Sequence, residues 1–261
     1  MTLGAAVGFF DSGVGGLSVL RHALDQFGGL PLLYVADSAY APYGRRSQQQ
    51  VQERARLITR FLVGQGARCV VLACNTATAH AIELLRAEFE IPIVGMEPAL
   101  KPAAALTRGG GVAVLATPGT LGSGRFARLL SDHAGAVRVH TLECAGWVEA
   151  VESGAQDTVA THRLVAAGLR PLQDTGVDTY VLGCTHFPFL ENAIRQALGE
   201  VAALIDPGPA VVRQARRRMN LAAENQGVSQ VRMYSSGPPH RLRDQARELI
   251  GMDAEALPLP V

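Results

Sequence analysis

The stretch Val70-Val71-Leu72-Ala73-Cys74-Asn75-Thr76-Ala77 joins a short apolar run to a cysteine and then to the polar start of a helix. A second stretch, Tyr180-Val181-Leu182-Gly183-Cys184-Thr185-His186, repeats this arrangement about 110 positions later. In both, the apolar run is typical of a buried strand. A cysteine between a strand end and a helix N-terminus is well placed to become a thiolate. The two stretches therefore predict a pair of thiols facing one substrate, one removing a proton from a carbon and the other returning one.

Strand-like and helix-like segments alternate along the whole chain. We expect strands at Ala6–Phe10, Leu32–Ala36, Cys69–Ala73, Ile93–Gly95, Gly111–Ala116, Val137–Leu142, Asp178–Gly183 and Ala203–Asp206. We expect helices near Gly15–Phe27, Gln48–Gly64, Ala77–Glu88, Gly122–Ala134, Trp147–Ser153, Asp157–Leu172, Phe189–Leu198 and Pro207–Ala223. This β-α-β-α order predicts parallel sheets with right-handed crossovers. Strands that are apolar without alternation, such as Val112–Leu115, are typical of sheets covered by helices on both faces.

The two halves of the chain also resemble each other. Val7–Phe10 leads into Asp11-Ser12-Gly13, and Val112–Leu115 leads into Ala116-Thr117-Pro118-Gly119, with an offset of about 105. We therefore predict an α/β fold with two similar lobes and mainly parallel sheets. The active site should lie in the cleft between the lobes, at the carboxyl ends of the strands.

The lobe boundaries follow from the links between the repeats. Residues 1–97 and 208–261 should form lobe one, which carries Cys74, and residues 98–207 should form lobe two, which carries Cys184. The C-terminal helices, to about Ile250, should pack on lobe one. The tail Ala256-Leu257-Pro258-Leu259-Pro260-Val261 is expected to be irregular.

Composition excludes several classes of protein. The 261 residues are 48% hydrophobic, enough for real cores, and the net charge of +1 does not indicate nucleic acid as a partner. We expect neither a signal peptide at residues 1–6 nor a membrane span, because no apolar stretch reaches about 18 residues. The four cysteines show no zinc spacing and no Cys-x-x-Cys pair, so we expect no metal site. Free thiols then favour the reducing cytoplasm.

Each cysteine can also be explained without a function, since free cysteine is often a small buried hydrophobe. For Cys74 and Cys184 the equivalent positions in two repeats favour a functional role. Cys69 lies inside a strand and is better explained as part of the core. Cys144 begins a loop before a helix and remains ambiguous, with a structural role favoured.

The segment Asp11-Ser12-Gly13-Val14-Gly15-Gly16 resembles a phosphate-binding loop. It is not Gly-x-Gly-x-x-Gly and no lysine follows, so dinucleotide binding has little support. An aspartate at this place can bind a substrate ammonium group or influence a nearby thiol. Asp11 or Ser12 can equally cap the following helix, and the two roles are compatible.

Polar residues follow both cysteines. The backbone N–H groups and side chains of Asn75, Thr76 and Thr185 can bind a carboxylate at helix N-termini. His186 lies two residues from Cys184 and can hold or transfer its proton.

Several motifs, in this order along the chain, resemble the motif set of glutamate racemases. They are Phe10-Asp11-Ser12-Gly13-Val14-Gly15-Gly16-Leu17-Ser18-Val19, Ala36-Asp37-Ser38, Pro42-Tyr43-Gly44, Ala73-Cys74-Asn75-Thr76-Ala77 and Gly183-Cys184-Thr185-His186-Phe187-Pro188. A lone Cys-Asn-Thr would indicate only the wider aspartate/glutamate racemase superfamily. The first block, combined with Pro-Tyr-Gly, narrows the resemblance to the glutamate racemases.

This resemblance implies interconversion of L- and D-glutamate without a cofactor, supplying D-glutamate for bacterial peptidoglycan. By position, Cys74 removes the α-proton of D-glutamate and Cys184 that of L-glutamate. Asp11 matches a carboxylate near the first thiol, His186 and Glu152 match groups that assist the second, and Asp37 matches an acidic position of unassigned role. The substrate-binding positions are matched by Asp11, Ser12, Pro42, Tyr43, Gly44, Asn75, Thr76, Thr117, Thr120, Thr185 and His186. We also expect a homodimer, with no nucleic acid or membrane required.

The chain departs from the family pattern in three places. Phe187 replaces a frequent tyrosine, and Gly119 replaces an alanine in the motif around Thr117 and Thr120. Glu149 replaces a proline, which leaves two glutamates as candidates to assist Cys184. The choice of Glu152 rests on the alignment of Glu152-Ser153-Gly154 alone.

Other functions are compatible with parts of this pattern. A two-lobed amino-acid-binding protein needs the cleft but not both cysteines. An aspartate or hydantoin racemase of the same superfamily would keep the cysteines and change the side-chain pocket. A cysteine hydrolase needs one nucleophile. With ten residues ahead of Asp11, we expect no segment for precursor-dependent activation.

Overall fold

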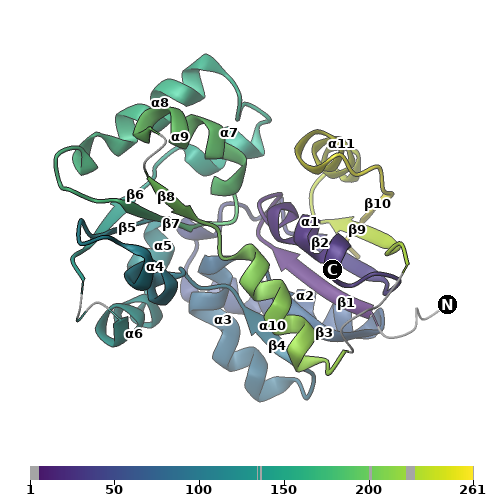
Figure 1. Cartoon of the computed structure of the whole chain (residues 1–261). Helices are drawn as coiled ribbons and strands as arrows, with labels where there is room; N and C mark the ends of the chain where they lie inside the picture. The colour runs from purple at the N-terminus through teal and green to yellow at the C-terminus, as the bar shows by residue number, and fades with distance from the viewer. Residues whose placement is uncertain (1–5, 134, 136, 200–201, 222–226, 261) are drawn as a thin grey trace.

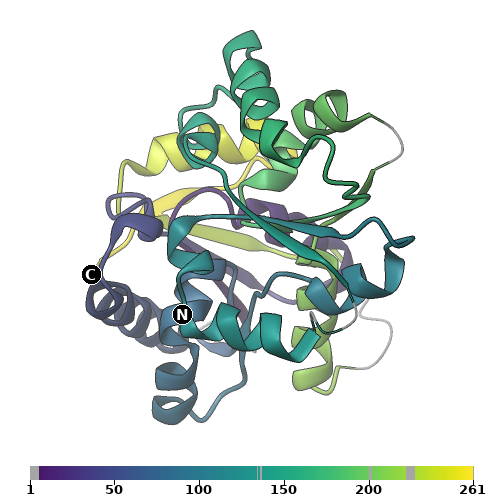
Figure 2. The same cartoon turned by 90° about the vertical axis from the view of Figure 1, so that its left-hand side faces the viewer.

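Two parallel sheets organise the chain (Figures 1 and 2), in a computed structural model that describes residues 6–133, 135, 137–199, 202–221 and 227–260. The larger sheet has six strands in the order β10-β9-β2-β1-β3-β4. Its strands are β1 (Ala6–Asp11), β2 (Leu32–Ala36), β3 (Ala67–Leu72), β4 (Ile93–Gly95), β9 (Val231–Ser235) and β10 (Ala256–Pro258). The smaller sheet has the order β6-β5-β7-β8. Its strands are β5 (Val112–Ala116), β6 (Val139–Glu143), β7 (Thr179–Gly183) and β8 (Ala203–Ile205).

The same strand order occurs twice, which confirms the prediction of two similar α/β lobes. In the larger sheet β2-β1-β3-β4 are neighbours, and β6-β5-β7-β8 repeat this order in the smaller sheet. All recorded pairings between these strands are parallel. The strand before each of the two sequence-predicted thiols, β3 and β7, is therefore the equivalent strand of its lobe.

Helices cover the sheets, as the apolar strands require. The larger sheet packs with α1 (Leu17–Gln26), α2 (Gln48–Gly64), α3 (Asn75–Glu88), α10 (Gly208–Arg218) and α11 (Pro239–Ile250). The smaller sheet is accompanied by α4 (Leu100–Leu106), α5 (Pro118–Leu121), α6 (Gly124–His133), α7 (Trp147–Glu152), α8 (Val159–Leu169) and α9 (Glu191–Leu198). Short 3-10 helices are η1 (Tyr43–Arg45), η3 (Arg170–Leu172) and η4 (Phe187–Leu190). Every residue of β1, β2, β5 and β7 is buried, because both faces are covered.

The prediction of an irregular C-terminal tail is wrong for residues Ala256–Pro258, and Val261 lies outside the described residues. Ala256–Pro258 forms the edge strand β10, which pairs in parallel with β9. Proline is tolerated there because an edge strand leaves one row of backbone groups unpaired. Leu259 is buried, and its N–H donates to the carbonyl of Ser235 at 2.8 Å.

Some helices differ from the predicted segments. The segment Gly122–Ala134 was expected as one helix, but a helix at Pro118–Leu121 precedes α6, and Ala134 lies outside the described residues. The helix expected over Pro207–Ala223 ends at Arg218, and residues 222–223 are not described. Neither α4 nor β9 was expected, since both are short and lie between stronger signals.

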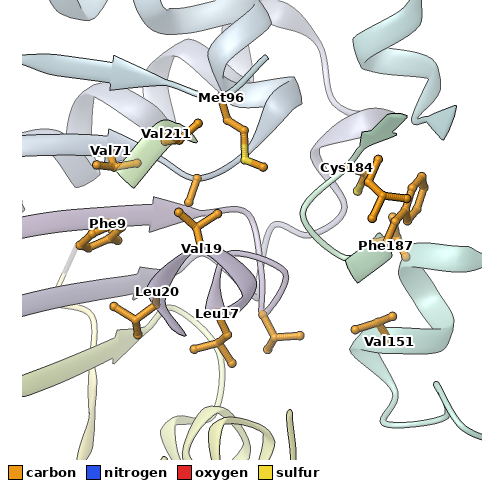
Figure 3. Close-up of a cluster of buried hydrophobic side chains, with 14 of the residues drawn as sticks. Phe9, Leu17, Val19, Leu20, Val71, Met96, Val151, Cys184, Phe187 and Val211 are labelled. Carbon is orange, nitrogen blue, oxygen red and sulfur yellow. The ribbon is translucent and has the colours of Figure 1, made fainter. Parts of the chain in front are cut away.

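A single cluster of buried hydrophobic side chains includes residues of both lobes. Figure 3 shows Phe9, Val19 and Met96 on the side of the larger sheet, with Val151 and Phe187 on the other. The rings of Trp147 and Phe187 also meet edge to face, with centroids 5.0 Å apart. This shared core holds the carboxyl ends of the two sheets close together. Within the described ranges, no helix is long and apolar enough to cross a membrane.

Candidate active site

A narrow pocket lies where the loops after the strands of both sheets meet. The larger-sheet lobe lines it with Ser12, Pro42, Tyr43, Gly44, Cys74, Asn75 and Thr76. The other lobe lines it with Thr117, Thr120, Val148, Gly183, Cys184, Thr185 and His186. The free volume of about 20 Å³ is little more than one water molecule needs. A larger molecule therefore enters only when the surrounding loops or lobes move apart.

Cys74 caps the N-terminus of α3 with its sulfur. The backbone N–H of Ala77 donates to Sγ at 3.4 Å, and the thiol donates to Oγ of Ser12 at 3.7 Å. Burial raises the pKa of the Cys74 thiol to about 12, and the nearby carboxylate of Asp11 raises it further while the Ala77 N–H opposes the shift. In this closed pocket Cys74 is therefore a protonated thiol, suited to donate a proton.

Cys184, His186 and Glu152 form a row of three ionisable side chains, each in contact with the next. Its Sγ lies 3.6 Å from Nδ1 of His186, and Nε2 of His186 lies 2.7 Å from Oε1 of Glu152. Burial alone would lower the pKa of His186, but the contacts with Cys184 and Glu152 raise it well above its usual range. Burial opposes ionisation of Glu152 too, yet His186 and the N–H of Val14 hold its pKa below the usual value. The imidazole therefore lies within proton-transfer distance of Cys184.

The glycine-rich loop of the larger-sheet lobe packs directly on this row. A Cβ atom on Gly13 would lie 1.8 Å from Oε1 of Glu152, and one on Gly15 would lie 2.4 Å from Nδ1 of His186. The N–H of Val14 donates to Oε1 of Glu152 at 2.9 Å. The glycines thus allow one lobe to approach the ionisable groups of the other, and the loop's N–H groups of Gly13 and Val14 bind carboxylates of the chain itself.

Asp11 lies behind the pocket rather than in its lining. Its Oδ1 accepts hydrogen bonds from the hydroxyl of Ser12 at 3.1 Å and the N–H of Gly13 at 2.8 Å, and its Oδ2 accepts from the hydroxyl of Thr185 at 2.8 Å. Burial raises the pKa of this carboxyl to about 6, although His186, the Gly13 N–H and the Thr185 hydroxyl oppose the shift. Asp11 therefore orients two lining hydroxyls, one from each lobe.

Hydroxyl and amide groups gather at the other end of the pocket. The Oγ1 atoms of Thr76, Thr117 and Thr120 lie 3.0 to 3.3 Å from one another. The amide of Asn75 is buried, and within the described structure neither its nitrogen nor its oxygen has a hydrogen-bond partner. A buried amide without a partner is costly, so Asn75 is available to a bound polar molecule.

Asp37 is fully buried and does not line the pocket. Its carboxylate accepts two hydrogen bonds from the guanidinium of Arg54, at 2.9 and 2.8 Å, and one from the hydroxyl of Tyr43 at 2.5 Å. Tyr43 lines the pocket, so Asp37 and Arg54 hold the Pro42–Gly44 wall in place.

The two remaining cysteines stay out of the pocket. Cys69 is fully buried inside β3, as expected for a core residue, and Cys144 is buried in the shared core. All four cysteines are free. In the part of the chain that is described, no three His, Cys, Asp or Glu side chains gather closely enough to hold a metal ion.

Residues 16–215 match the profile of the family described as Asp/Glu/Hydantoin racemase. The glutamate racemase of Ectopseudomonas mendocina is 48% identical over 254 residues, covering 96% of this chain and 97% of the relative. The glutamate racemase of Pseudomonas aeruginosa strain PAO1 is 47% identical, covering 91% of each. This chain belongs to the glutamate racemase family.

Solved structures agree with the glutamate racemase assignment. A glutamate racemase from Bacillus anthracis superposes with a TM-score of 0.90 at 28% identity, covering 98% of both chains. The Escherichia coli glutamate racemase, solved with L-glutamate and the activator UDP-MurNAc-ala, superposes with a TM-score of 0.86 at 31% identity, covering 97% of both chains. The protein is therefore an amino-acid racemase.

The pocket between the two sheets brings together most of the site residues predicted from the sequence. Twelve of them line it, whereas Asp11, Glu152 and Asp37 lie behind the lining. Of the two candidate glutamates, Glu152 contacts His186, and Glu149 forms an exposed ion pair with Arg45 at 2.5 Å.

Sequence reasoning missed two lining residues, Val148 and Gly183. The glycine directly before Cys184 was a usable signal in the sequence. The structure explains why it is a glycine, because a Cβ atom there would lie 2.8 Å from the carbonyl oxygen of Leu115. Val148 carried no signal, since a valine in an apolar helix face is typical of the core.

Proposed function

We propose that this protein interconverts L- and D-glutamate without a cofactor, with Cys74 and Cys184 as two acid/base groups on opposite sides of the α-carbon. The observation that carries the proposal is that two buried thiols, from equivalent strand ends of the two lobes, line one pocket. A hydrolase would need one of these nucleophiles and a binding protein neither.

In the L-to-D direction, the thiolate of Cys184 removes the α-proton of L-glutamate. The thiol of Cys74 gives its proton to the opposite face of the same carbon, so that D-glutamate forms. Cys74 is then the thiolate and Cys184 the thiol, and the reverse reaction restores the starting state. The pairing of Cys184 with His186 and the raised pKa of Cys74 support the L-accepting form as the resting form.

The carbanion-like state between the two proton transfers needs electrostatic stabilisation, because the α-hydrogen of an amino acid is a very weak acid. We assign the α-carboxylate to the donors of Asn75 and Thr185, and the side-chain carboxylate to the hydroxyls of Thr76, Thr117 and Thr120. Three hydroxyls in contact at the far end of the pocket suit a second carboxylate.

The physiological role follows from the family resemblance. We propose that the D-glutamate formed is used for peptidoglycan, that the enzyme works in the cytoplasm and that it forms a homodimer.

Circular dichroism of purified enzyme with L-glutamate, D-glutamate, L-aspartate and a substituted hydantoin tests the proposal. The circular dichroism signal should decay to zero with either enantiomer of glutamate, when equal amounts of the two are present. Little change in the signal is expected with the other compounds. If aspartate or the hydantoin is racemised faster than glutamate, the protein has another activity of the superfamily. Hydrolysis, or binding without turnover, would overturn the proposal.

A further inference from the structure

The carbonyl of Glu152, the last residue of α7, is held by two side chains of the C-terminal helix α11. Nη2 of Arg241 donates to this oxygen at 2.8 Å, and Nε2 of Gln245 donates to it at 2.8 Å. Carbonyls in the last turn of a helix have no partner within the helix. Helix α11 packs on β9 and α1 of the other lobe (Figure 1). These two donors therefore join the lobes at Glu152.

Gln245 occupies a position where the helix pattern calls for an apolar side chain. It lies on the buried face of α11 with Leu242 and Ala246, and only 8% of its surface is exposed. Burying an amide costs free energy unless it forms hydrogen bonds. The bond to the Glu152 carbonyl offsets that cost, so the amide is explained by its contact with α7 and not by the packing of α11.

The carboxylate of Glu152 is held from the same lobe. The N–H of Val14 donates to Oε1, the atom that also contacts Nε2 of His186. Both ends of this one residue, the carbonyl and the carboxylate, are therefore fixed by the lobe that does not contain it. The next contact along the row is Nδ1 of His186 to Sγ of Cys184 at 3.6 Å.

We propose that Arg241 and Gln245 are positioning residues for the Cys184 side of the reaction. By fixing the backbone of Glu152 they hold its carboxylate on His186, and so hold the imidazole against Cys184. Within the described structure, neither residue is hydrogen-bonded to Cys74 or to its partners Ser12 and Ala77. The effect of losing them should therefore be confined to one of the two proton transfers. This inference rests on the proposed two-thiol racemisation.

The test uses Arg241→Met, Gln245→Met and the double variant, which remove the donors and keep the length of each side chain. Arg243→Met is the matched control, because Arg243 is on the same helix and bonds only to its neighbour Asp244 in the described structure. Misplacing a reacting group by about 1 Å can cost 100-fold. We expect kcat/KM to fall a few-fold in each single variant, roughly 10-fold in the double variant, and not in Arg243→Met.

Isotope effects distinguish positioning from a general loss of structure. The fall in kcat/KM must be equal in both directions, because the two enantiomers have equal free energy. With a slower step at Cys184, the primary isotope effect on kcat/KM should rise with α-deuterated L-glutamate and fall with α-deuterated D-glutamate. Arg241→Lys keeps a donor and should stay near wild type.

Isotope effects that stay at wild-type values, or that change in the same sense for both enantiomers, would overturn the inference. If thermal unfolding shows that the double variant does not fold, the same comparison is made on the single variants. Wild-type enzyme that does not racemise glutamate would instead refute the proposed function, so the two failures are distinct.

Discussion

Asp11→Asn should make the protein more stable at neutral pH. Burial raises the pKa of Asp11 from 3.8 to about 6 in the folded protein. Each pKa unit corresponds to about 1.4 kcal/mol, so the charged carboxylate costs about 3 kcal/mol of folding free energy above pH 6. Asparagine fits the same network, because Oδ1 can accept from Ser12 and Gly13 while Nδ2 donates to the hydroxyl of Thr185.

The stability that Asp11→Asn gains over wild type should increase as the pH rises. Between pH 4 and 6 the folded protein binds more protons at Asp11 than the unfolded chain does, so wild-type stability falls as pH rises through this range. Asp11→Asn lacks this fall. Its advantage should be near zero below pH 4 and about 3 kcal/mol above pH 6, which is a rise in Tm of about 5–10 °C.

Thermal and urea unfolding from pH 4 to 8 measure this difference. Asp178→Asn is a control of opposite sign: although burial opposes it, donors such as Thr107 and Arg108 lower the pKa of Asp178, so its charge stabilises the fold at neutral pH. Asp178→Asn should therefore be less stable than wild type by an amount that stays constant from pH 4 to 8, because a lowered carboxyl pKa changes stability only as pH falls below about 4. A less stable Asp11→Asn at pH 7.5, or a difference that does not vary with pH, would refute the reasoning.

Three further predictions concern the reaction. Cys74→Ala and Cys184→Ala should each abolish racemisation with unchanged thermal unfolding, and near wild-type turnover by either would contradict the two-thiol mechanism. His186→Asn should slow the chemical step at Cys184 by roughly 100-fold if general acid–base help is fully lost, seen as an isotope effect that rises for L-glutamate and falls for D-glutamate. Isotope effects that are equal for the two enantiomers and unchanged from wild type would show that His186 does not assist proton transfer at Cys184. Enzyme dialysed against a chelator, with a reductant present, should keep its activity; a loss restored by zinc or pyridoxal phosphate would show that a cofactor takes part.

The sequence predicts the repeat because its signals are local. Apolar runs ending in Cys74 and Cys184 mark equivalent strands, and the strand orders β2-β1-β3-β4 and β6-β5-β7-β8 confirm the two similar lobes. The edge strands were not predictable in this way. β9 is partly exposed and β10 contains a proline, so neither shows the buried apolar run of a central strand.

The pocket residues were predictable where they belong to a sequence motif. Which of them line the pocket, and which support the lining from behind, was not predictable. Asp11 ends β1 and Asp37 follows β2, yet both carboxylates accept hydrogen bonds from other groups of the chain behind the pocket lining. The roles of Arg241 and Gln245 depend on a contact with a residue about 90 positions away. Sequence periodicity cannot show such a contact, because it reports only which face of a helix is buried.

The two-thiol mechanism is tested most directly by the fate of the α-proton in deuterated water. With L-glutamate at early times, the account predicts that the D-glutamate formed carries solvent deuterium at the α-carbon while the remaining L-glutamate keeps its proton. This follows because one thiol takes the substrate proton and the other delivers one from its own exchangeable site. Product that retains the original α-proton, or substrate that gains deuterium as fast as product, would show that a single group acts on both faces and would contradict the account.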